Sequence, residues 1–449
     1  MSVLSVSISA NLWLIPSHGH LHHRESRATL RRMPSAREIL ERVFREEHGL
    51  IIASLIRRSG SFDLAEESLQ EAFSSALANW EDEGTPKNPA AWLTTVAHRK
   101  LLDMLRREKT KNEKQPELQY ETQRLQDESY PSLEEELEYS DDRLRLIFTC
   151  CHPTLSREAQ VALTLRTLGG LTTPEIARAF LLPETTLAQR LVRAKHKIRV
   201  ARIPYQVPPR EVLPQRLSSV QAVIYLIFNE GFAATSGANL VRRDLCTEAI
   251  RLGRVLTHLL PDEPENLGLL ALMLLHDSRR NARIDQQGEL VTLEEQDRSL
   301  WDEEAIGEGL RLVETALRLG RVGTYQLQAA IAAVHAEAKS PAETDWRQIA
   351  ALYAELMRIK PSPVVALNHA AAVAMSEGFE EGLGLMDEIS VASRLDDYYF
   401  FHAARADLLR RLDRFEEARS AYSRALELTE NEVEQKHVRR RMREINGKG

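Results

Sequence analysis

Basic side chains gather in two segments of the chain, and acidic side chains fill the stretch between them. Residues 184–202 hold six Lys or Arg against one acid, and residues 94–111 hold six against two. The intervening residues 116–142 hold ten acids against Arg124 alone. The formal net charge of −7 would not by itself indicate nucleic-acid binding. The local pattern does, because a basic helix can neutralise phosphates and displace their counterions.

The basic residues at 184–202 belong to a segment with the pattern of a helix-turn-helix. Thr172, with Glu175 three residues later, forms a capping box that predicts the start of a first helix. Pro183 ends a short turn, after which apolar residues recur at helical spacing through 184–199. Gln can pair with adenine and Arg with guanine in the major groove, whereas Lys suits phosphates. The side chains expected to contact DNA are Thr185, Gln189, Arg190, Arg193, Lys195 and Lys197. The alternative is a solvated basic helix.

The basic residues at 94–111 follow a helix that is acidic on one face. From Asp63 onward, the apolar face expected to be buried is Ala65, Leu69, Ala72, Phe73, Ala76, Leu77 and Trp80. The opposite face carries Glu66, Glu67, Gln70 and Glu71. Asn88-Pro89 then begins another helix, which continues to Leu105. Trp92 in that helix can stack on an unpaired base or pack in the core, and the sequence leaves both interpretations open.

Helical spacing continues over the rest of the chain, so the sequence predicts an all-α protein. Near the C-terminus Ala370, Val373, Gly382 and Met386 match Ala406, Leu409, Ala418 and Tyr422 at an offset of 36 residues. This is close to the tetratricopeptide period of about 34. We therefore expect two small helical domains followed by a tetratricopeptide-like α-solenoid, with generic helical hairpins as the alternative. The predicted divisions are a disordered leader or an early start codon over 1–33, a first domain over 34–110, an acidic linker over 111–140, a helix-turn-helix domain over 141–202, a helical extension over 203–306 and helical repeats over 307–449.

The composition indicates a soluble helical protein without a recognisable catalytic or metal site. The chain has 449 residues, of which 43% are hydrophobic and 28% charged, enough for several cores. Three cysteines are too few for a disulfide framework, which favours a reducing, cytoplasmic location. No stretch reaches the ~20 apolar residues of a membrane helix, so no membrane association is expected. Cys150-Cys151-His152 lacks a second ligand pair for zinc, and no phosphate loop or nucleophile motif is present. We expect no enzyme activity, cofactor or metal.

The acidic helix and the two basic segments together resemble a known family. FDLAEESLQEAFSSALANW (62–80) and NPAAWLTTVAHRKLLDMLRR (88–107) are similar to region 2 of the sigma-70 family of sigma factors. The family motif of Trp-Leu, an Ala, an Asp and paired Args is matched by Trp92, Leu93, Ala97, Asp103, Arg106 and Arg107. LTTPEIARAFLLPETTLAQRLVRAKHKIR (171–199) resembles region 4. YLIFNEGF, LLALMLLHDSRR and LEEQDRSLWD resemble the extracytoplasmic-function (group IV) subgroup with a C-terminal tetratricopeptide-like extension.

This resemblance implies a protein that binds core RNA polymerase, recognises −35 and −10 promoter elements and initiates DNA-templated transcription. The polymerase-binding residues it implies are Asp63, Glu66, Glu67, Gln70 and Glu71. The −10 DNA residues it implies are Trp92, Arg99, Lys100, Arg106 and Arg107. The expected partners are core RNA polymerase and double-stranded and melted promoter DNA. Arg99 stands where the family usually has Asn, and Ala188 where a basic residue is common. Because of these two departures, base selectivity at Arg99 and Ala188 is left open.

Two other interpretations of the whole chain remain open. One is a helix-turn-helix transcriptional activator with a tetratricopeptide-like regulatory domain, and the other is a scaffold whose basic helices are soluble surface. Only the sigma-factor interpretation needs both the acidic helix and the helix from Trp92 to Arg107. Under it, the tail beyond Arg202 regulates the sigma domains in cis or receives a protein partner on a repeat surface. The acidic linker then imitates nucleic acid in a channel or serves as a solvated tether.

Overall fold

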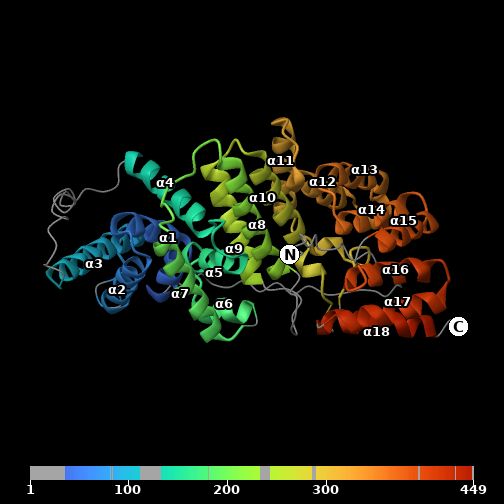
Figure 1. The fold of residues 1–449 in the computed structure, drawn as a ribbon, viewed down its shortest axis with the longest axis horizontal. Coiled ribbons are helices and arrows are strands. Elements are labelled where there is room, and N and C mark those ends of the chain that lie inside the picture. The colour runs from blue at the N-terminus through green and yellow to red at the C-terminus, as the bar shows by residue number, and fades with distance from the viewer. Residues whose placement is uncertain are drawn as a thin grey trace. The chain divides into compact units, whose positions relative to one another are not determined.

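The computed structural model describes residues 36–80, 82, 84–111, 133–180, 182–232, 243–285, 290–392, 395–429 and 431–446. Across these ranges the regular elements are helical apart from isolated bridge residues, Ile284 and Leu290 among them, so the predicted all-α class is confirmed (Figure 1). The chain forms two compact units: an N-terminal unit that ends at Val223 and a C-terminal unit from Ile224 onward. The division falls within helix α8.

The N-terminal unit contains the two basic segments and the acidic helix. Its helices are α1 (Ala36–Ser59), α2 (Phe62–Trp80), α3 (Pro89–Lys111), α4 (Leu133–Cys150), α5 (Arg157–Thr167), α6 (Thr173–Ala179), α7 (Glu184–Val200) and the first part of α8 (Leu213–Phe232). α1, α2 and α3 pack on one another, and α7 packs on α5 and α6. The predicted division at residue 140 falls inside α4, which begins at Leu133 and is one continuous helix.

The proline-rich stretch after α7 packs on the N-terminal unit. Tyr205 Oη lies 2.8 Å from the carbonyl oxygen of Ala53 and 3.1 Å from that of Asp142. In the first part of α8, Arg216 donates to the Phe148 carbonyl at 2.7 Å. The fold of this unit therefore extends past the predicted domain end at Arg202.

The C-terminal unit is a series of helices packed in sequence order. These helices are the second part of α8, α9 (Arg243–Leu259), α10 (Pro264–Asp277), α11 (Glu303–Arg318), α12 (Thr324–Glu337), α13 (Trp346–Ile359), α14 (Pro363–Ser376), α15 (Phe379–Ala392), α16 (Tyr399–Arg411), α17 (Phe415–Leu428) and α18 (Glu432–Asn446). Short 3-10 turns lie at Arg280–Ala282, Arg298–Leu300 and Pro341–Glu343. The division predicted at residue 306 falls inside α11, so it does not separate two domains.

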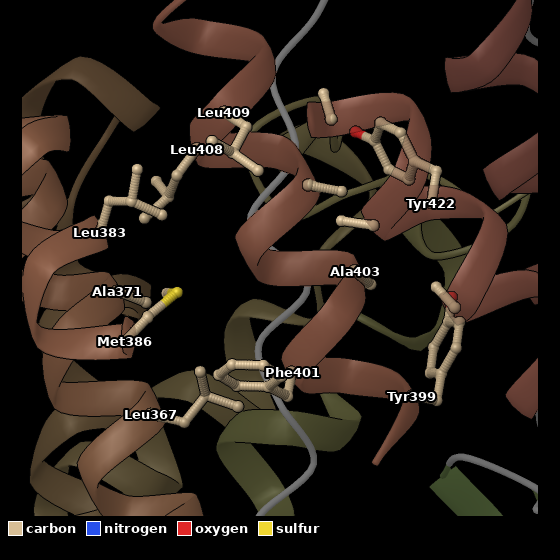
Figure 2. Close-up of a cluster of buried hydrophobic side chains, with 14 of the residues drawn as sticks. Leu367, Ala371, Leu383, Met386, Tyr399, Phe401, Ala403, Leu408, Leu409 and Tyr422 are labelled. Carbon is tan, nitrogen blue, oxygen red and sulfur yellow. The ribbon is translucent and has the colours of Figure 1, made fainter. Parts of the chain in front are cut away.

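The pairs matched at an offset of 36 residues lie in two helical hairpins, α14–α15 and α16–α17. Figure 2 shows their shared core, in which Leu367, Met386 and Phe401 come together. Gly382 permits the first hairpin to close, because an added Cβ would lie 2.3 Å from the Cβ of Ala374 and 2.7 Å from the Ala370 carbonyl oxygen. The corresponding residue in the second hairpin is the buried Ala418. Helical hairpins are thus present where the repeat was expected, while their tetratricopeptide assignment stays a prediction.

Buried ion pairs join the segment after α10 to the last helices. Arg411 of α16 lies between Asp407, at 2.7 Å, and Glu294, at 3.5 Å, and all three side chains are nearly inaccessible. Arg441 of α18 pairs with Glu295 at 2.9 Å. Because a lost partner would leave a buried charge uncompensated, these pairs fix the position of the 294–295 segment within the C-terminal unit.

Candidate nucleic-acid interface

The acidic residues of α2 lie on its outward face, as the helical spacing predicted. Asp63, Glu67 and Gln70 are exposed, and Glu66 and Glu71 are half-buried. The opposite face is buried as expected at Ala65, Leu69, Ala72, Ala76 and Trp80. Two details were wrong. Leu77 is 49% exposed and does not join the core. The helix begins one residue earlier than expected, because Ser61 Oγ accepts a hydrogen bond from the Leu64 N–H.

The basic face of α3 lies opposite its buried face. Asn88 Oδ1 accepts from the Ala91 N–H at 3.1 Å and so caps the helix where Asn88-Pro89 predicted its start. Leu93, Ala97, Leu101 and Met104 are buried, whereas Arg99, Arg106 and Arg107 are exposed and Lys100 is half-buried. The four basic side chains that the resemblance singled out thus lie on the side of α3 away from its buried residues.

One ion pair joins the acidic face of α2 to the basic face of α3. Lys100 Nζ lies 3.2 Å from Glu71 Oε2. Both side chains are more than a third exposed, so the pair contributes little to stability. It does place a residue expected to bind polymerase beside one expected to bind DNA.

Trp92 occupies a position between the two roles that the sequence left open. It is half-buried, and its ring meets that of the buried Trp80 edge-on, with centroids 5.4 Å apart. An edge-to-face pair of this kind holds the ring in one orientation. Trp92 thus packs on the core with part of its surface accessible on α3.

His98 on α3 is a polar residue of this region that no sequence pattern singled out. Its Nε2 lies 3.2 Å from Ser54 Oγ on α1. Burial, together with the nearby guanidinium groups of Arg58 and Arg57, lowers the pKa of His98 to about 3, so the imidazole is neutral near pH 7. Only its neighbours in the fold, which the sequence does not reveal, indicate this state.

The helix-turn-helix is built as the capping box predicted. The Thr172 N–H donates to Glu175 Oε2 at 2.7 Å, and the Glu175 N–H lies 3.4 Å from Thr172 Oγ1. In α7 the side chains that face inward are Leu187, Leu191, Ala194 and Ile198. This burial fixes which face of α7 remains available to DNA.

Most of the residues expected to contact DNA lie on the accessible face of α7. Thr185, Gln189, Arg193 and Lys197 are exposed, and Arg190 is half-buried. Val192, which was not among the residues expected to contact DNA, is 67% exposed between Gln189 and Arg193. Because residues three apart share a helix face, its spacing from Gln189 was the sequence signal that could have indicated this exposure.

Lys195 is placed differently from the other basic residues of α7. Its ammonium lies 3.1 Å from Asp63 Oδ1 and 2.9 Å from Glu66 Oε2 on α2. The Lys195 side chain is only 16% exposed. A residue expected to contact phosphate is thus held by two residues expected to bind polymerase.

A buried carboxylate links α1 to α4. Asp142 is fully buried and accepts from Arg57 of α1 at 2.7 Å and from Arg145 of its own helix at 2.8 Å. Burial raises the pKa of Asp142, although both guanidinium groups oppose the change. The last acid of the negatively charged stretch therefore serves the interior of the fold.

Cys150 and Cys151 are buried, each beside a threonine side chain. The sulfur atoms of Cys150 and Cys151 each lie 3.6 Å from a threonine hydroxyl, those of Thr167 and Thr164. Burial raises the pKa of the Cys151 thiol to about 11 and raises that of Cys150 as well, so neither is a reactive thiolate near pH 7. Among the residues that the structure describes, no cluster of three or more His, Cys, Asp or Glu could hold a metal ion. None of the described helices is long and apolar enough to span a membrane.

Comparisons with known proteins cover both units. A family model described as Sigma-70 region 2 matches residues 43–111, and one described as Sigma-70, region 4 matches residues 145–198. A third, described as a family of unknown function (DUF6596), matches residues 216–317. These matches correspond to α1–α3, to the end of α4 through α7, and to α8–α11.

A curated relative matches most of the chain. The protein called "Uncharacterized protein R00370" from Rhizobium meliloti (strain 1021) is 44% identical over 391 residues, which cover 86% of this chain and 91% of the relative. No solved structure matches the chain. The two proteins therefore belong to one family. Sigma factors direct RNA polymerase to promoters and are not enzymes. With region 2 followed by region 4 and a helical C-terminal extension, the chain belongs to the sigma-70 family of sigma factors, in its extracytoplasmic-function branch.

Proposed function

We propose that the chain docks on core RNA polymerase through the outward face of α2 and gives the enzyme specificity for a −35 and a −10 element. The observation that carries this proposal is the pairing of two faces within region 2. An acidic face on α2 adjoins a basic face on α3, with Glu71 and Lys100 in contact between them. A helix-turn-helix activator would need only α6 and α7. The α2–α3 arrangement supports a protein that binds polymerase and DNA side by side.

Recognition of the −35 element is proposed for α7. Gln189 and Arg193 are exposed near the middle of the helix and can form hydrogen bonds with base edges in the major groove. The exposed Val192 between them can contact a thymine methyl group. Lys197 is proposed to bind phosphate, where it adds affinity without sequence information.

Opening of the −10 element is proposed for α3. Holding a base out of the duplex costs a few kcal/mol, which stacking on an aromatic ring and a cationic surface can offset. Trp92 supplies the partly accessible ring, and Arg99, Arg106 and Arg107 supply exposed positive charge. Arg99 stands where Asn is usual, so we expect it to bind phosphate and not a base edge.

Regulation in cis is proposed for the C-terminal unit. Its buried ion pairs and continuous helical cores make it a folded body and not a solvated tail. The chain passes from region 4 into this body through a single helix, α8. A ligand or protein that binds the unit can thus alter sigma activity if it favours one conformation of the chain.

The proposed docking face is tested by the affinity of the full chain for purified core polymerase. The exposed Glu67 is reversed to lysine, and the control is Glu211→Lys, an exposed charge reversal in the same unit that lies on neither α2 nor α3. We expect Glu67→Lys to weaken binding about tenfold or more, because a lysine at this position would face a polymerase surface proposed to bind acidic side chains. The affinity of the control should be unchanged. Equal affinities for the two variants would contradict docking through α2.

A further inference from the structure

Two buried arginines of the C-terminal unit lie against one aromatic ring. Arg279 and Arg283 come directly after α10, and Phe232 is the last residue of α8. The guanidinium carbon of Arg283 lies 3.7 Å from the centroid of the Phe232 ring, and that of Arg279 lies 5.4 Å from it. Arg283 also donates a hydrogen bond to the Phe232 carbonyl oxygen. Two positive charges therefore occupy one small region of the interior.

Among the described residues, no carboxylate lies within ion-pair distance of Arg283. Asp277 and Glu434 act on its charge only from a longer range, and both bind other groups. Asp277 accepts from Arg280 Nε at 2.8 Å, and Glu434 accepts from the Thr429 hydroxyl at 2.5 Å. Because a guanidinium has several N–H donors, Arg283 retains donors for a further acceptor.

Other nearly inaccessible arginines of the same unit have close carboxylate partners. Arg411 lies 2.7 Å from Asp407, and Arg441 lies 2.9 Å from Glu295. These pairs show how this fold compensates a buried guanidinium with its own side chains. Arg283 differs from them, although it is buried to a similar degree.

Burial of the two guanidiniums is unfavourable without a counter-charge. Burial lowers the pKa of Arg283 to about 10. Burial, together with the nearby charge of Arg283, lowers the pKa of Arg279 to about 9. Both side chains are still protonated near pH 7. A bound anion would supply the close negative charge that stabilises buried cations.

A neutral histidine adds a further donor to this cluster. Arg279 Nη2 lies 3.2 Å from His276 Nδ1, and the His276 ring meets that of Phe232 edge-on, with centroids 5.2 Å apart. Desolvation and the two guanidiniums lower the pKa of His276 well below its usual value, so the ring is neutral near pH 7. Because arginine only donates, Nδ1 accepts and the ring proton is on Nε2. His276 is partly exposed, so the cluster reaches the surface at this residue.

The cluster falls in stretches of the sequence to which promoter recognition assigns no role. Phe232 ends YLIFNEGF (225–232), and His276 and Arg279 belong to LLALMLLHDSRR (269–280). Both stretches lie within residues 216–317, which match the family of unknown function. The cluster therefore indicates a chemistry for a part of the chain that neither region 2 nor region 4 includes.

We propose that Arg279, Arg283 and His276 form a binding site for a small oxyanion, a molecule that carries a phosphate or carboxylate group. A guanidinium presents paired N–H donors that match two oxygens of such a group. The Phe232 ring stabilises both guanidiniums through cation–π contact and limits their orientations. The use of this site as an input to regulation in cis rests on the proposed function, whereas the binding itself does not.

Calorimetric titration of the full chain with inorganic phosphate and with succinate tests the site, in a buffer whose only other anion is chloride. We expect at least one of the two to bind, and which one binds identifies the preferred group. Arg283→Lys should weaken that binding about tenfold or more, because lysine keeps the charge and loses the paired donors. The control is Arg251→Lys on α9, whose arginine pairs with Glu248 at 2.8 Å. Its affinity for the anion should be unchanged.

Three results of this titration would overturn the proposal. They are binding of neither anion, binding that Arg283→Lys leaves intact, and an equal loss of binding in Arg283→Lys and Arg251→Lys. None of these measurements uses polymerase or DNA. A failure of the site is therefore distinguishable from a failure of the proposed function.

Urea unfolding gives a second measurement that does not depend on heats of binding. Phosphate stabilises folded proteins in general because it is excluded from their surface, so the relevant quantity is the difference between variants. We expect phosphate to raise the unfolding midpoint of the unaltered chain and of Arg251→Met more than that of Arg283→Met, since only the last lacks the anion site. An equal increase in all three proteins would contradict a phosphate site at Arg283, and succinate is compared in the same way.

Discussion

At the scale of single residues, the polar contacts of the helix-turn-helix are of two kinds. Some join residues within one helical turn, and others join residues far apart in the sequence. The capping box of Thr172 and Glu175 was predictable because both partners lie within one turn of the same helix. The pairing of Lys195 with Asp63 and Glu66 was not, because the sequence does not specify which distant elements meet. Lys195 and the exposed Lys197 look equivalent in the sequence, and only tertiary packing distinguishes them.

The capping box should contribute measurably to stability. Thr172→Ala removes the hydroxyl that lies against both the Glu175 carboxylate and its N–H, and we expect unfolding to become easier by about 1 kcal/mol. Urea denaturation of the full chain checks this. Thr154→Ala, an exposed threonine in the turn before α5, is the control. A loss no greater than the control's would mean that the box is not stabilising.

The exposed residues of α7 should differ in how they affect DNA binding. Lys197→Ala should weaken binding to all sequences alike and reduce the slope of log affinity against log salt by about 1, because one phosphate contact is lost. Gln189→Ala should instead reduce the preference for the cognate site over a mismatched one. Anisotropy titrations at several salt concentrations distinguish the two. Identical effects on selectivity would contradict the assignment of base and phosphate contacts.

The partly buried His98 predicts a direction for the pH dependence of stability. Its folded pKa, about 3, lies below the unfolded value near 6.5, so between these values the unfolded chain binds more protons. Stability from this group is present above pH 6.5 and is lost as the pH falls toward 3, with a limit of about 1.4 kcal/mol per pH unit. His98→Gln should flatten the decrease in unfolding free energy between pH 6.5 and 4. An unchanged profile would show that His98 accepts a proton in the fold.

At the scale of helices, the sequence predicted most elements and missed where domains end. Apolar spacing located α2, α6 and α7 to within a residue or two at each end, because each buries one face, whereas α3 continues six residues past the predicted Leu105 to Lys111. The divisions predicted at 140 and 306 fell inside α4 and α11, each of which is one continuous helix. The N-terminal unit also extends past the predicted domain end at Arg202, because Tyr205 and Arg216 bind backbone carbonyls that no sequence pattern marks.

Two glycines on α15 give a matched test of the repeat packing. Gly382→Ala should destabilise the C-terminal unit by about 1–3 kcal/mol, because the new methyl group would overlap Ala374 and the Ala370 carbonyl. Gly384→Ala, on the same helix, meets nothing within 4 Å and should stabilise the unit by about 0.5–1 kcal/mol. Thermal unfolding of the two variants checks the signs. Shifts in the same direction would contradict the close approach of α14 and α15.

At the scale of the whole molecule, function depends on how two folded units share one chain. Region 2 and region 4 occupy the N-terminal unit, and the helices after α8 form a body with its own core. The family and the order of its parts were recognisable from short motifs. The ion pair of Lys195 on α7 with Asp63 and Glu66 on α2 was not, since it is a property of the assembled unit. The cis-regulatory role of the C-terminal unit follows only if its presence changes what the N-terminal unit does.

The central claim is that this chain gives core polymerase new start sites. The direct measurement maps transcript 5′ ends from genomic DNA incubated with purified bacterial core polymerase, with and without the full chain. The account predicts a set of start sites that depends on the chain, with shared sequence blocks at the −10 and −35 positions, and a loss of that set with Glu67→Lys. An unchanged set of start sites when the chain is added, under conditions in which it is folded, would contradict the account.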